Sequence, residues 1–166
     1  TDAAGNTGPK GTDSATIDTT VPEGPAIEIT EDANNDGYIN RDELKDNDID
    51  VRVTLPEGAA AGDTLTISGS GNVDKVITLT QAQIDAGYVD VKFNPTADNT
   101  DFVATATVRD VAGNSAGPVS DSARLQLSAP GKPVVTITED ANNDGFISKA
   151  ELDGDIGVSV ALPATA

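Results

Sequence analysis

The chain has 166 residues and a net charge of −18, from 10 Lys and Arg against 28 Asp and Glu. A polyanion of this kind repels phosphate backbones and anionic lipids, so neither nucleic acid nor a membrane surface is an expected partner. The chain has no His and no Cys, which excludes Ser–His and Cys–His catalysis, zinc sites built from His or Cys, and disulfides. No apolar run approaches the roughly 20 residues of a membrane-spanning helix, so we expect no membrane insertion.

An internal repeat sets the expected domain organisation. The run Ile29–Gly37 recurs as Ile137–Gly145, and the spacing is that of a whole domain in tandem rather than of a solenoid. Two short segments with two prolines each, 20–25 and 128–133, fit stiff linkers. We therefore expect 1–20 to end one unit, 21–128 to be a complete unit, and 129–166 to open a third.

Strands dominate the predicted elements of the complete unit. Apolar and polar residues alternate in short stretches, as they do in half-buried strands. In chain order these stretches are 27–29, 49–55, 65–67, 77–79, 89–93, 102–109 and 123–127. Residues 81–86 fit a single helical turn between the fourth and fifth stretches. Seven short strands separated by turn residues predict an all-β fold, an immunoglobulin-like β-sandwich.

Two segments fit the EF-hand calcium loop, D-x-[DN]-x-[DN]-G-x5-E. Ca²⁺ takes six to eight oxygen ligands, and this spacing supplies carboxylate, amide and main-chain oxygens, with Glu closing the shell. Gly37 allows the sharp turn, and Ile39 at position 8 is expected to pin the loop to the core. The predicted ligands are Asp32, Asn34, Asp36, Tyr38 (by its carbonyl), Asn40 and Glu43, and in the second copy Asp140, Asn142, Asp144, Phe146 (by its carbonyl), Ser148 and Glu151.

The surroundings of the loop differ from those of an EF-hand protein. Residues 25–30 have the pattern of a strand rather than of a helix, and only 41–45 fit a helical turn. We therefore expect the calcium loop between the first two strands of the sandwich. The alternative is an Asx-rich turn without a metal.

The strand order of such a sandwich predicts which turns share an end. The calcium loop is expected beside the linker 128–133, and the turn 95–101 at the same end brings Asp98 and Asp101 close. Asp110, in the turn 110–118, is expected at the opposite end beside the linker 20–25, where it can share an ion with Asp18. The alternative for Asp18 and Asp110 is that both carboxylates are simply solvated. Because a net charge of −18 is self-repulsive, calcium is expected to stabilise the fold.

Three motifs carry a resemblance to a known family. They are T-D-x-A-G-N at 1–6 (altered at 109–114), D-T-T-x-P at 18–22, and I-T-E-D-x-N-N-D-G-x-I at both calcium loops. The chain resembles the tandem immunoglobulin-like repeats of large bacterial RTX-type adhesins. The resemblance implies extracellular extender domains on the bacterial cell surface, whose partners are neighbouring repeats and calcium ions. It also implies that calcium near the linkers restricts domain motion, a role that falls on Asp18 and Asp110.

We therefore expect a non-enzymatic extender, stiffened by calcium, that projects a distal binding region for adhesion or biofilm formation. The alternative is a calcium-dependent module that binds a carbohydrate, ice or a second copy. T-x-T pairs such as 64–66 and 105–107 would suggest ice, but Thr is a favoured residue on the outer face of any strand. An enzyme is not expected, because no insertion forms a cleft around a carboxylate pair.

Overall fold

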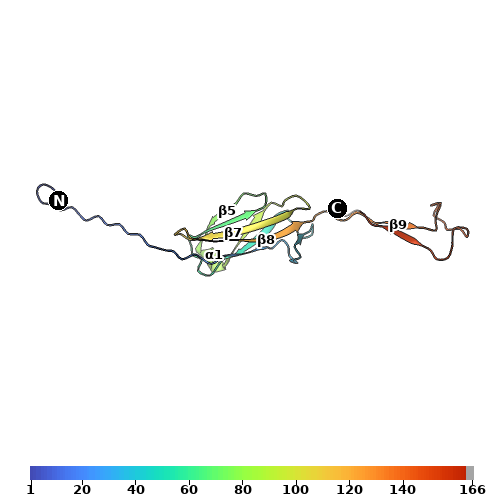
Figure 1. The fold of residues 1–166 in the computed structure, drawn as a ribbon, viewed down its shortest axis with the longest axis horizontal. Coiled ribbons are helices and arrows are strands. Elements are labelled where there is room, and N and C mark those ends of the chain that lie inside the picture. The colour runs from blue at the N-terminus through green and yellow to red at the C-terminus, as the bar shows by residue number, and fades with distance from the viewer. Residues whose placement is uncertain (164–166) are drawn as a thin grey trace.

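The computed structural model describes residues 1–163, which are mostly β-strand with one short helix (Figure 1). The elements are β1 (Ala26–Ile29), β2 (Tyr38–Ile39), β3 (Ile49–Thr54), β4 (Thr64–Gly69), β5 (Lys75–Thr78), α1 (Gln81–Ala86), β6 (Tyr88–Phe93), β7 (Asp101–Arg109), β8 (Ser115–Leu125), β9 (Val134–Ile137) and β10 (Val158–Ala161). Within the described residues, no helix is long and apolar enough to cross a bilayer.

The strands form three sheets. One has the order β1-β3-β6, a second has the order β2-β8-β7-β4-β5, and the third is the pair β10-β9. All paired strands are antiparallel except β2 and β8, which run parallel. Each stretch that the alternation predicted contributes a strand, and α1 forms at 81–86 as expected. The all-β fold class is therefore confirmed.

One hydrophobic core lies between the three-stranded and the five-stranded sheets. Alternate residues of β3, such as Val51 and Val53, are buried on one side, and alternate residues of β7, such as Phe102 and Ala104, are buried on the other. The Phe93 and Phe102 rings approach with their centroids 5.9 Å apart. Apart from these two rings, the buried core residues are aliphatic. Burying one large apolar side chain contributes roughly 1.5–3 kcal/mol, so aliphatic side chains supply most of the packing that holds the two sheets together.

The last strand of this body is longer than the sequence predicts. The alternation indicated a strand near 123–127, whereas β8 begins at Ser115. Its pairing with β7 shifts register between Ala106 and Val108, and Gly117 lies at this bulge with φ 104°. A Cβ atom on Gly117 would lie 2.7 Å from the Ala106 carbonyl oxygen. The irregular pairing breaks the alternation of apolar and polar residues, so the sequence gives no periodic signal for the first half of β8.

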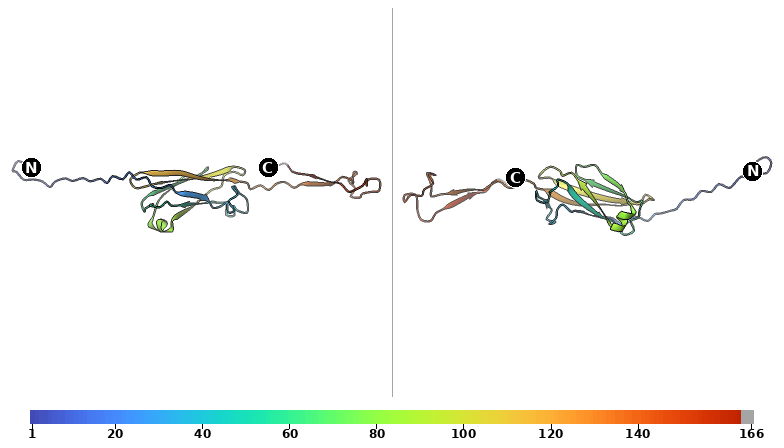
Figure 2. Two further views of the ribbon diagram at one scale, coloured as in Figure 1. Left: turned by 60° about the horizontal axis from the view of Figure 1, so that its bottom comes forward. Right: turned by 180° about the vertical axis from the view of Figure 1, so that it is seen from behind.

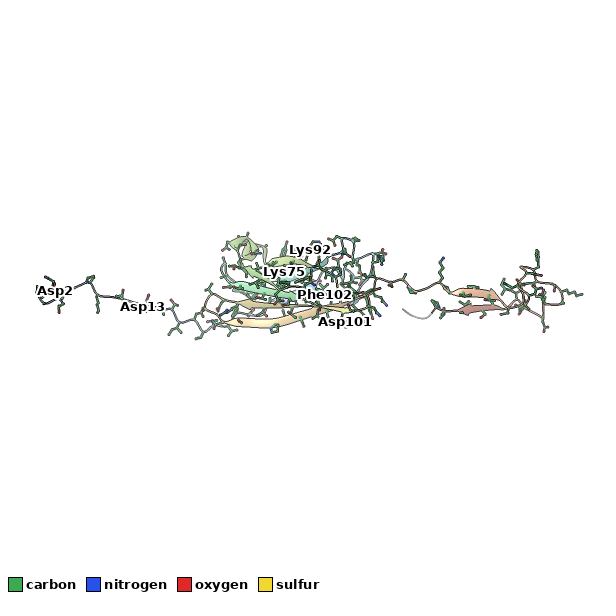
Figure 3. The ribbon with its side chains drawn as sticks, turned by 90° about the horizontal axis from the view of Figure 1, so that it is seen from above. Asp2, Asp13, Lys75, Lys92, Asp101 and Phe102 are labelled. Atoms are coloured by element: carbon green, nitrogen blue, oxygen red, sulfur yellow. The ribbon has the colours of Figure 1, made fainter. Side chains whose placement is uncertain are left out.

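Two segments lie outside the body. The N-terminal run leaves one end in extended form, with Asp2 and Asp13 away from the sheets (Figure 3). The β9–β10 hairpin lies beyond the opposite end (Figures 1 and 2). In the internal repeat Ile137 corresponds to Ile29, yet Ile137 is 46% exposed and Ile29 is 3% exposed. The β9–β10 hairpin therefore has apolar residues that correspond to core residues of the body, but within residues 1–163 no second sheet packs over them. The predicted boundaries 1–20, 21–128 and 129–166 remain a prediction, and 164–166 lie outside the described residues.

Candidate metal centre

The first candidate loop links β1 to β3 and brings its leading ligand positions together. The Asp36 N–H donates to Asp32 Oδ1 at 3.1 Å and to Asn34 Oδ1 at 2.9 Å. The Gly37 N–H donates to Asp32 Oδ2 at 2.8 Å, and the Asn34 amide donates to Asp36 Oδ2 at 3.1 Å. Asp32 is buried. Positions 1, 3 and 5 therefore gather on one side of a tight turn.

Positions 9 and 12 close the loop through a helix-type cap. Asn40 Oδ1 accepts from the N–H groups of Asp42 and Glu43 at 2.8 and 3.2 Å. In return Glu43 Oε2 accepts from the Asn40 N–H at 3.1 Å. The Leu44 N–H donates to the Asn40 carbonyl at 3.0 Å, which makes one helical turn where a turn was expected. This reciprocal arrangement is a capping box, and it brings the Glu43 carboxylate back to the start of that turn.

The second loop has the same internal geometry. The Asp144 N–H donates to Asp140 Oδ1 at 3.0 Å and to Asn142 Oδ1 at 2.9 Å. The Ser148 N–H donates to Glu151 Oε2 at 2.8 Å, and this bond is the main reason that the pKa of Glu151 is lowered. Since the hairpin lacks the surrounding sheets, the loop shape comes from the loop sequence itself.

The donor set fits a hard cation. In each loop the oxygens come from carboxylates, an amide or hydroxyl, and the main chain, which are the ligands that Ca²⁺ prefers. Across residues 1–163, however, no three acidic side chains form a ready-made metal-binding group. In the first loop the Glu43 carboxylate accepts a hydrogen bond from the Asn40 N–H rather than joining such a group. Asp32, Asn34, Asp36, Asn40 and Glu43, with the Tyr38 carbonyl, are the residues that would hold the ion.

Comparison with known proteins bears on these loops. The EF hand family matches residues 32–46 and 140–154. The chain therefore contains EF-hand calcium-binding motifs. No curated protein and no solved structure matches it. The two matched segments contain every ligand position predicted for the two loops, so the predicted motif is confirmed.

The first EF-hand motif connects the two large sheets. Its positions 7 and 8 are β2, in which Tyr38 and Ile39 pair with Arg124 and Leu125 of β8. The Arg124 N–H donates to the Gly37 carbonyl at 2.9 Å, and Ile39 is fully buried, as expected for position 8. The chain thus leaves the three-stranded sheet at β1 and enters the five-stranded sheet through the motif. Sequence analysis missed β2 because two residues are too few to show alternation.

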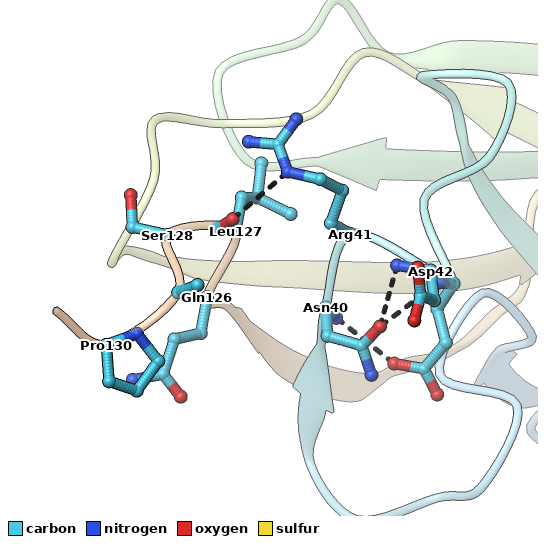
Figure 4. Close-up of a pocket in the computed structure, with 9 residues that line it drawn as sticks. Asn40, Arg41, Asp42, Gln126, Leu127, Ser128 and Pro130 are labelled. Atoms are coloured by element: carbon cyan, nitrogen blue, oxygen red, sulfur yellow. Dashed lines mark hydrogen bonds between the residues drawn. The ribbon is translucent and has the colours of Figure 1, made fainter. Parts of the chain in front are cut away.

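The same motif contacts the segment that follows β8. The Gln126 N–H donates to the Ile39 carbonyl at 3.0 Å, and Arg41 Nε donates to the Leu127 carbonyl at 3.3 Å. A hollow of about 910 Å³ lies between residues 40–43 and 126–130 (Figure 4). The expectation that the calcium loop lies beside the linker 128–133 is confirmed for the start of that linker.

Asp98 and Asp101 have different partners at this end. Asp98 Oδ1 accepts from the Leu127 N–H at 2.7 Å, and its other oxygen accepts from the Ser128 hydroxyl. The Ser128 contact is the largest cause of the lowered pKa of Asp98. Asp101 forms an ion pair with Arg124 at 3.0 Å. Asp98 therefore hydrogen-bonds to the start of the linker, and Asp101 forms an ion pair with β8. Their role as metal ligands remains a prediction.

Asp18 and Asp110 lie at the opposite end, as expected. They line one hollow of about 410 Å³, and the Asn114 amide donates to the Asp18 carbonyl at 3.3 Å. Each carboxylate caps its own turn: Asp110 accepts from the Asn114 N–H at 2.8 Å, and Asp18 accepts from the Thr20 N–H at 3.0 Å. Contact with the Asn114 side chain is the main cause of the lowered pKa of Asp110. Nothing in the described geometry joins the two carboxylates around one ion, and that role stays a prediction.

Sequence reasoning missed Asp63 in this hollow. Its side chain is buried, with 4% exposure, and its Oδ2 accepts from the Ala60 N–H at 2.9 Å. The signal was an Asp directly after Gly62 and before the apolar alternation of β4, which is typical of a turn that ends at a strand. Asp63 fixes this turn and adds a buried carboxylate to the lining.

Proposed function

We propose that the chain is a non-enzymatic, calcium-stiffened extender segment of a large bacterial cell-surface adhesin. The supporting observation is the position of the first EF-hand motif, which joins both large sheets and lies against residues 126–130, where β8 passes into the linker. An ion bound there would fix the loop relative to the two sheets and to the linker together. A calcium site whose purpose was storage or catalysis would have no need of that position.

An immunoglobulin-like sandwich is the fold that we propose for 21–128. Two sheets share one core, and the first strand is divided: β1 pairs with β3 in one sheet, while β2 pairs in parallel with β8 in the other. Repetition of the loop and strand pattern after residue 129 supports neighbouring copies of this unit as its partners in the same chain.

Calcium availability supports an extracellular location on the bacterial surface. Extracellular calcium modules work with dissociation constants near 10⁻⁴–10⁻³ M, and Ca²⁺ outside cells is abundant. The net charge of −18 would oppose a compact fold, and each bound ion removes part of that repulsion. Projection of a distal binding region in adhesion or biofilm formation belongs to the same proposal.

A calcium-dependent ligand module is the second candidate. The T-x-T pairs of β4 and β7 are the feature that favours it, and binding of ice or of glycans by the isolated chain would support it over the extender. Within the described residues, the lining of the hollow beside the EF-hand motif has no aromatic side chain, whereas sugar sites usually contain one.

Calcium removal is the direct test. We expect Ca²⁺ at a hundredfold excess over its dissociation constant to add about 2.7 kcal/mol to the free energy of unfolding. The melting temperature, measured with Ca²⁺ and with a chelator, should then differ by about 10 °C or more. Glu43→Gln should remove most of this difference. Asp42→Asn is the matched control, since Asp42 is an exposed acid at a non-ligand position of the same loop, and it should preserve the difference.

Small-angle scattering then separates the extender from a merely calcium-stabilised domain. With Ca²⁺ the chain should show one narrow distribution of lengths, and chelation should broaden it. A calcium-dependent melting temperature combined with an unchanged length distribution would contradict the extender and leave only the calcium site.

A further inference from the structure

Leu127 is bonded to side chains from two different loops at the point where β8 passes into the linker. Its N–H donates to Asp98 Oδ1 at 2.7 Å, in the turn between β6 and β7. Its carbonyl accepts from Arg41 Nε at 3.3 Å, in the first EF-hand motif (Figure 4). The Leu127 side chain is half-buried and packs against the core. Both main-chain polar groups of this residue are therefore held from outside β8.

The EF-hand motif makes two contacts with this segment, and they differ in kind. The Ile39 carbonyl accepts from the Gln126 N–H at 3.0 Å, which continues the parallel pairing of β2 with β8 and so belongs to the sheet. The Arg41 contact comes from a side chain and reaches one residue further. It ends on the peptide bond that joins Leu127 to Ser128, the bond that opens the linker. Arg41 is therefore placed to pass a change in the loop on to the linker.

Arg41 lies between two residues that would hold the ion. It is position 10 of the loop, and its neighbours Asn40 and Glu43 are positions 9 and 12. Asn40 Oδ1 accepts from the Glu43 N–H at 3.2 Å, and Glu43 Oε2 accepts from the Asn40 N–H at 3.1 Å. Oxygen ligands from both residues would fix the two ends of this turn around one ion. The direction in which Arg41 leaves the turn is thus set by the residues that would bind calcium.

Charge favours a cation at position 10. The Ser128 hydroxyl is the largest cause of the lowered pKa of Asp98, and the charge of Arg41 also contributes to it. Arg41 and Asp98 therefore attract each other while both are bonded to Leu127. Because the contact is exposed, it should add little to the free energy of unfolding. Its effect is expected on the direction of the linker rather than on the stability of the fold.

We propose that Arg41 is a positioning residue that transmits calcium binding at the first EF-hand loop to the linker. A bound ion fixes the turn 40–44, Arg41 then holds the Leu127 carbonyl while Asp98 holds the Leu127 N–H, and the linker leaves the body in one direction. Arg41 itself does not touch the ion. This inference rests on the proposed extender function and adds the route by which the ion acts on the linker.

Amide relaxation of the full chain, measured with Ca²⁺ and with a chelator, tests the proposal. Backbone order parameters near about 0.85 mark rigid residues, and values below about 0.6 mark flexible ones. In the wild type, Ca²⁺ should raise the order parameters of Ser128 and Ala129 toward the rigid value. Arg41→Met keeps most of the aliphatic stem and removes both the donor and the charge. It should lose at least half of that rise.

The calcium site itself should be unchanged in Arg41→Met. The dissociation constant of the first loop for Ca²⁺, followed through the Gly37 amide shift, should match that of the wild type. The difference in melting temperature between Ca²⁺ and chelator should match as well. Lys45→Met is the matched control, because Lys45 is an exposed cation of the same EF-hand motif. It removes the same charge and should keep the full rise in the order parameters.

The outcomes that contradict the proposal also separate it from the extender function. If Arg41→Met keeps the whole rise, Arg41 is not the route, and the extender function stands. If Arg41→Met weakens calcium binding at Gly37, or if Lys45→Met loses the rise as well, Arg41 acts through local charge and not through Leu127. If the wild-type order parameters do not respond to Ca²⁺, the calcium-stiffened extender is itself contradicted and this inference falls with it.

Discussion

At the scale of single residues, Ile39 couples the EF-hand motif to the core. It occupies position 8 of the loop, its side chain is fully buried, and its backbone pairs with β8. The equivalent Ile147 lies in the hairpin and is only partly buried. The same loop position is therefore a core residue in one copy and a half-exposed one in the other, which offers a matched pair of sites.

Ile39→Ala should lower the free energy of unfolding by about 2–5 kcal/mol, because it removes buried methyl groups and leaves a cavity. Chemical denaturation monitored by circular dichroism would measure this loss. Ile147→Ala should cost less than about 1 kcal/mol. Equal losses in the two variants would show that Ile39 does not join the loop to the core.

Asp98 gives the linker a dependence on pH. The Ser128 hydroxyl and the Leu127 N–H lower its pKa from the ordinary value of 3.8. A carboxylate whose pKa is lower in the folded state than in the unfolded state stabilises the fold at pH values above its unfolded-state pKa. This stabilisation is lost as the pH falls through the folded-state pKa. The protection of the Leu127 amide against hydrogen exchange should therefore fall below about pH 4.

Asp98→Asn should reproduce that loss of protection at neutral pH, since the amide holds no charge. Asp101→Asn is the control, because Asp101 pairs with Arg124 and not with the linker. Full protection of the Leu127 amide in Asp98→Asn would rule out this anchoring role.

At the scale of elements, the irregular pairing of β7 with β8 depends on Gly117. Its φ of 104° is unfavourable for other residues, and a Cβ atom there would contact the Ala106 carbonyl oxygen at 2.7 Å. Gly58 has a φ of 87° but has open space where a Cβ would go. The two glycines separate the cost of the backbone conformation from the cost of the clash.

Gly58→Ala should therefore cost about 1–2 kcal/mol of stability, which is the strain of the left-handed conformation alone. Gly117→Ala should cost more, with a loss of about 2–4 kcal/mol when the clash is added. Thermal denaturation of both variants would measure the difference. If the two lose the same stability, the close approach at the bulge does not matter.

At the scale of the whole molecule, the buried core is confined to the region that we propose as one complete unit. The core residues all fall between Ile29 and Leu125. The four valines of β9 and β10 are more than half exposed, namely Val134, Val135, Val158 and Val160. Limited proteolysis should thus cut first within 1–20 and 129–163.

A shortened chain of residues 21–128 should keep the melting temperature of the core and bind one Ca²⁺ at an EF-hand motif rather than two. Calorimetric titration measures the stoichiometry, and Glu43→Gln in the shortened chain should abolish it. A shortened chain that fails to fold would contradict the proposed boundaries.

Short-range patterns in the sequence were enough to predict α1, both EF-hand motifs and the strands of the body other than β2. Alternation marks the strands, and the loop geometry recurs in the hairpin without the surrounding sheets. The pairing of β2, the early start of β8 and the inward turn of Asp121 became visible only in the folded chain. Each of these depends on a partner far along the chain: β8 for β2, the Ala106 bulge for β8, and the Ile29 N–H for Asp121. A two-residue strand or a single carboxylate leaves no periodic signal, so its place is set by the sheet that packs against it.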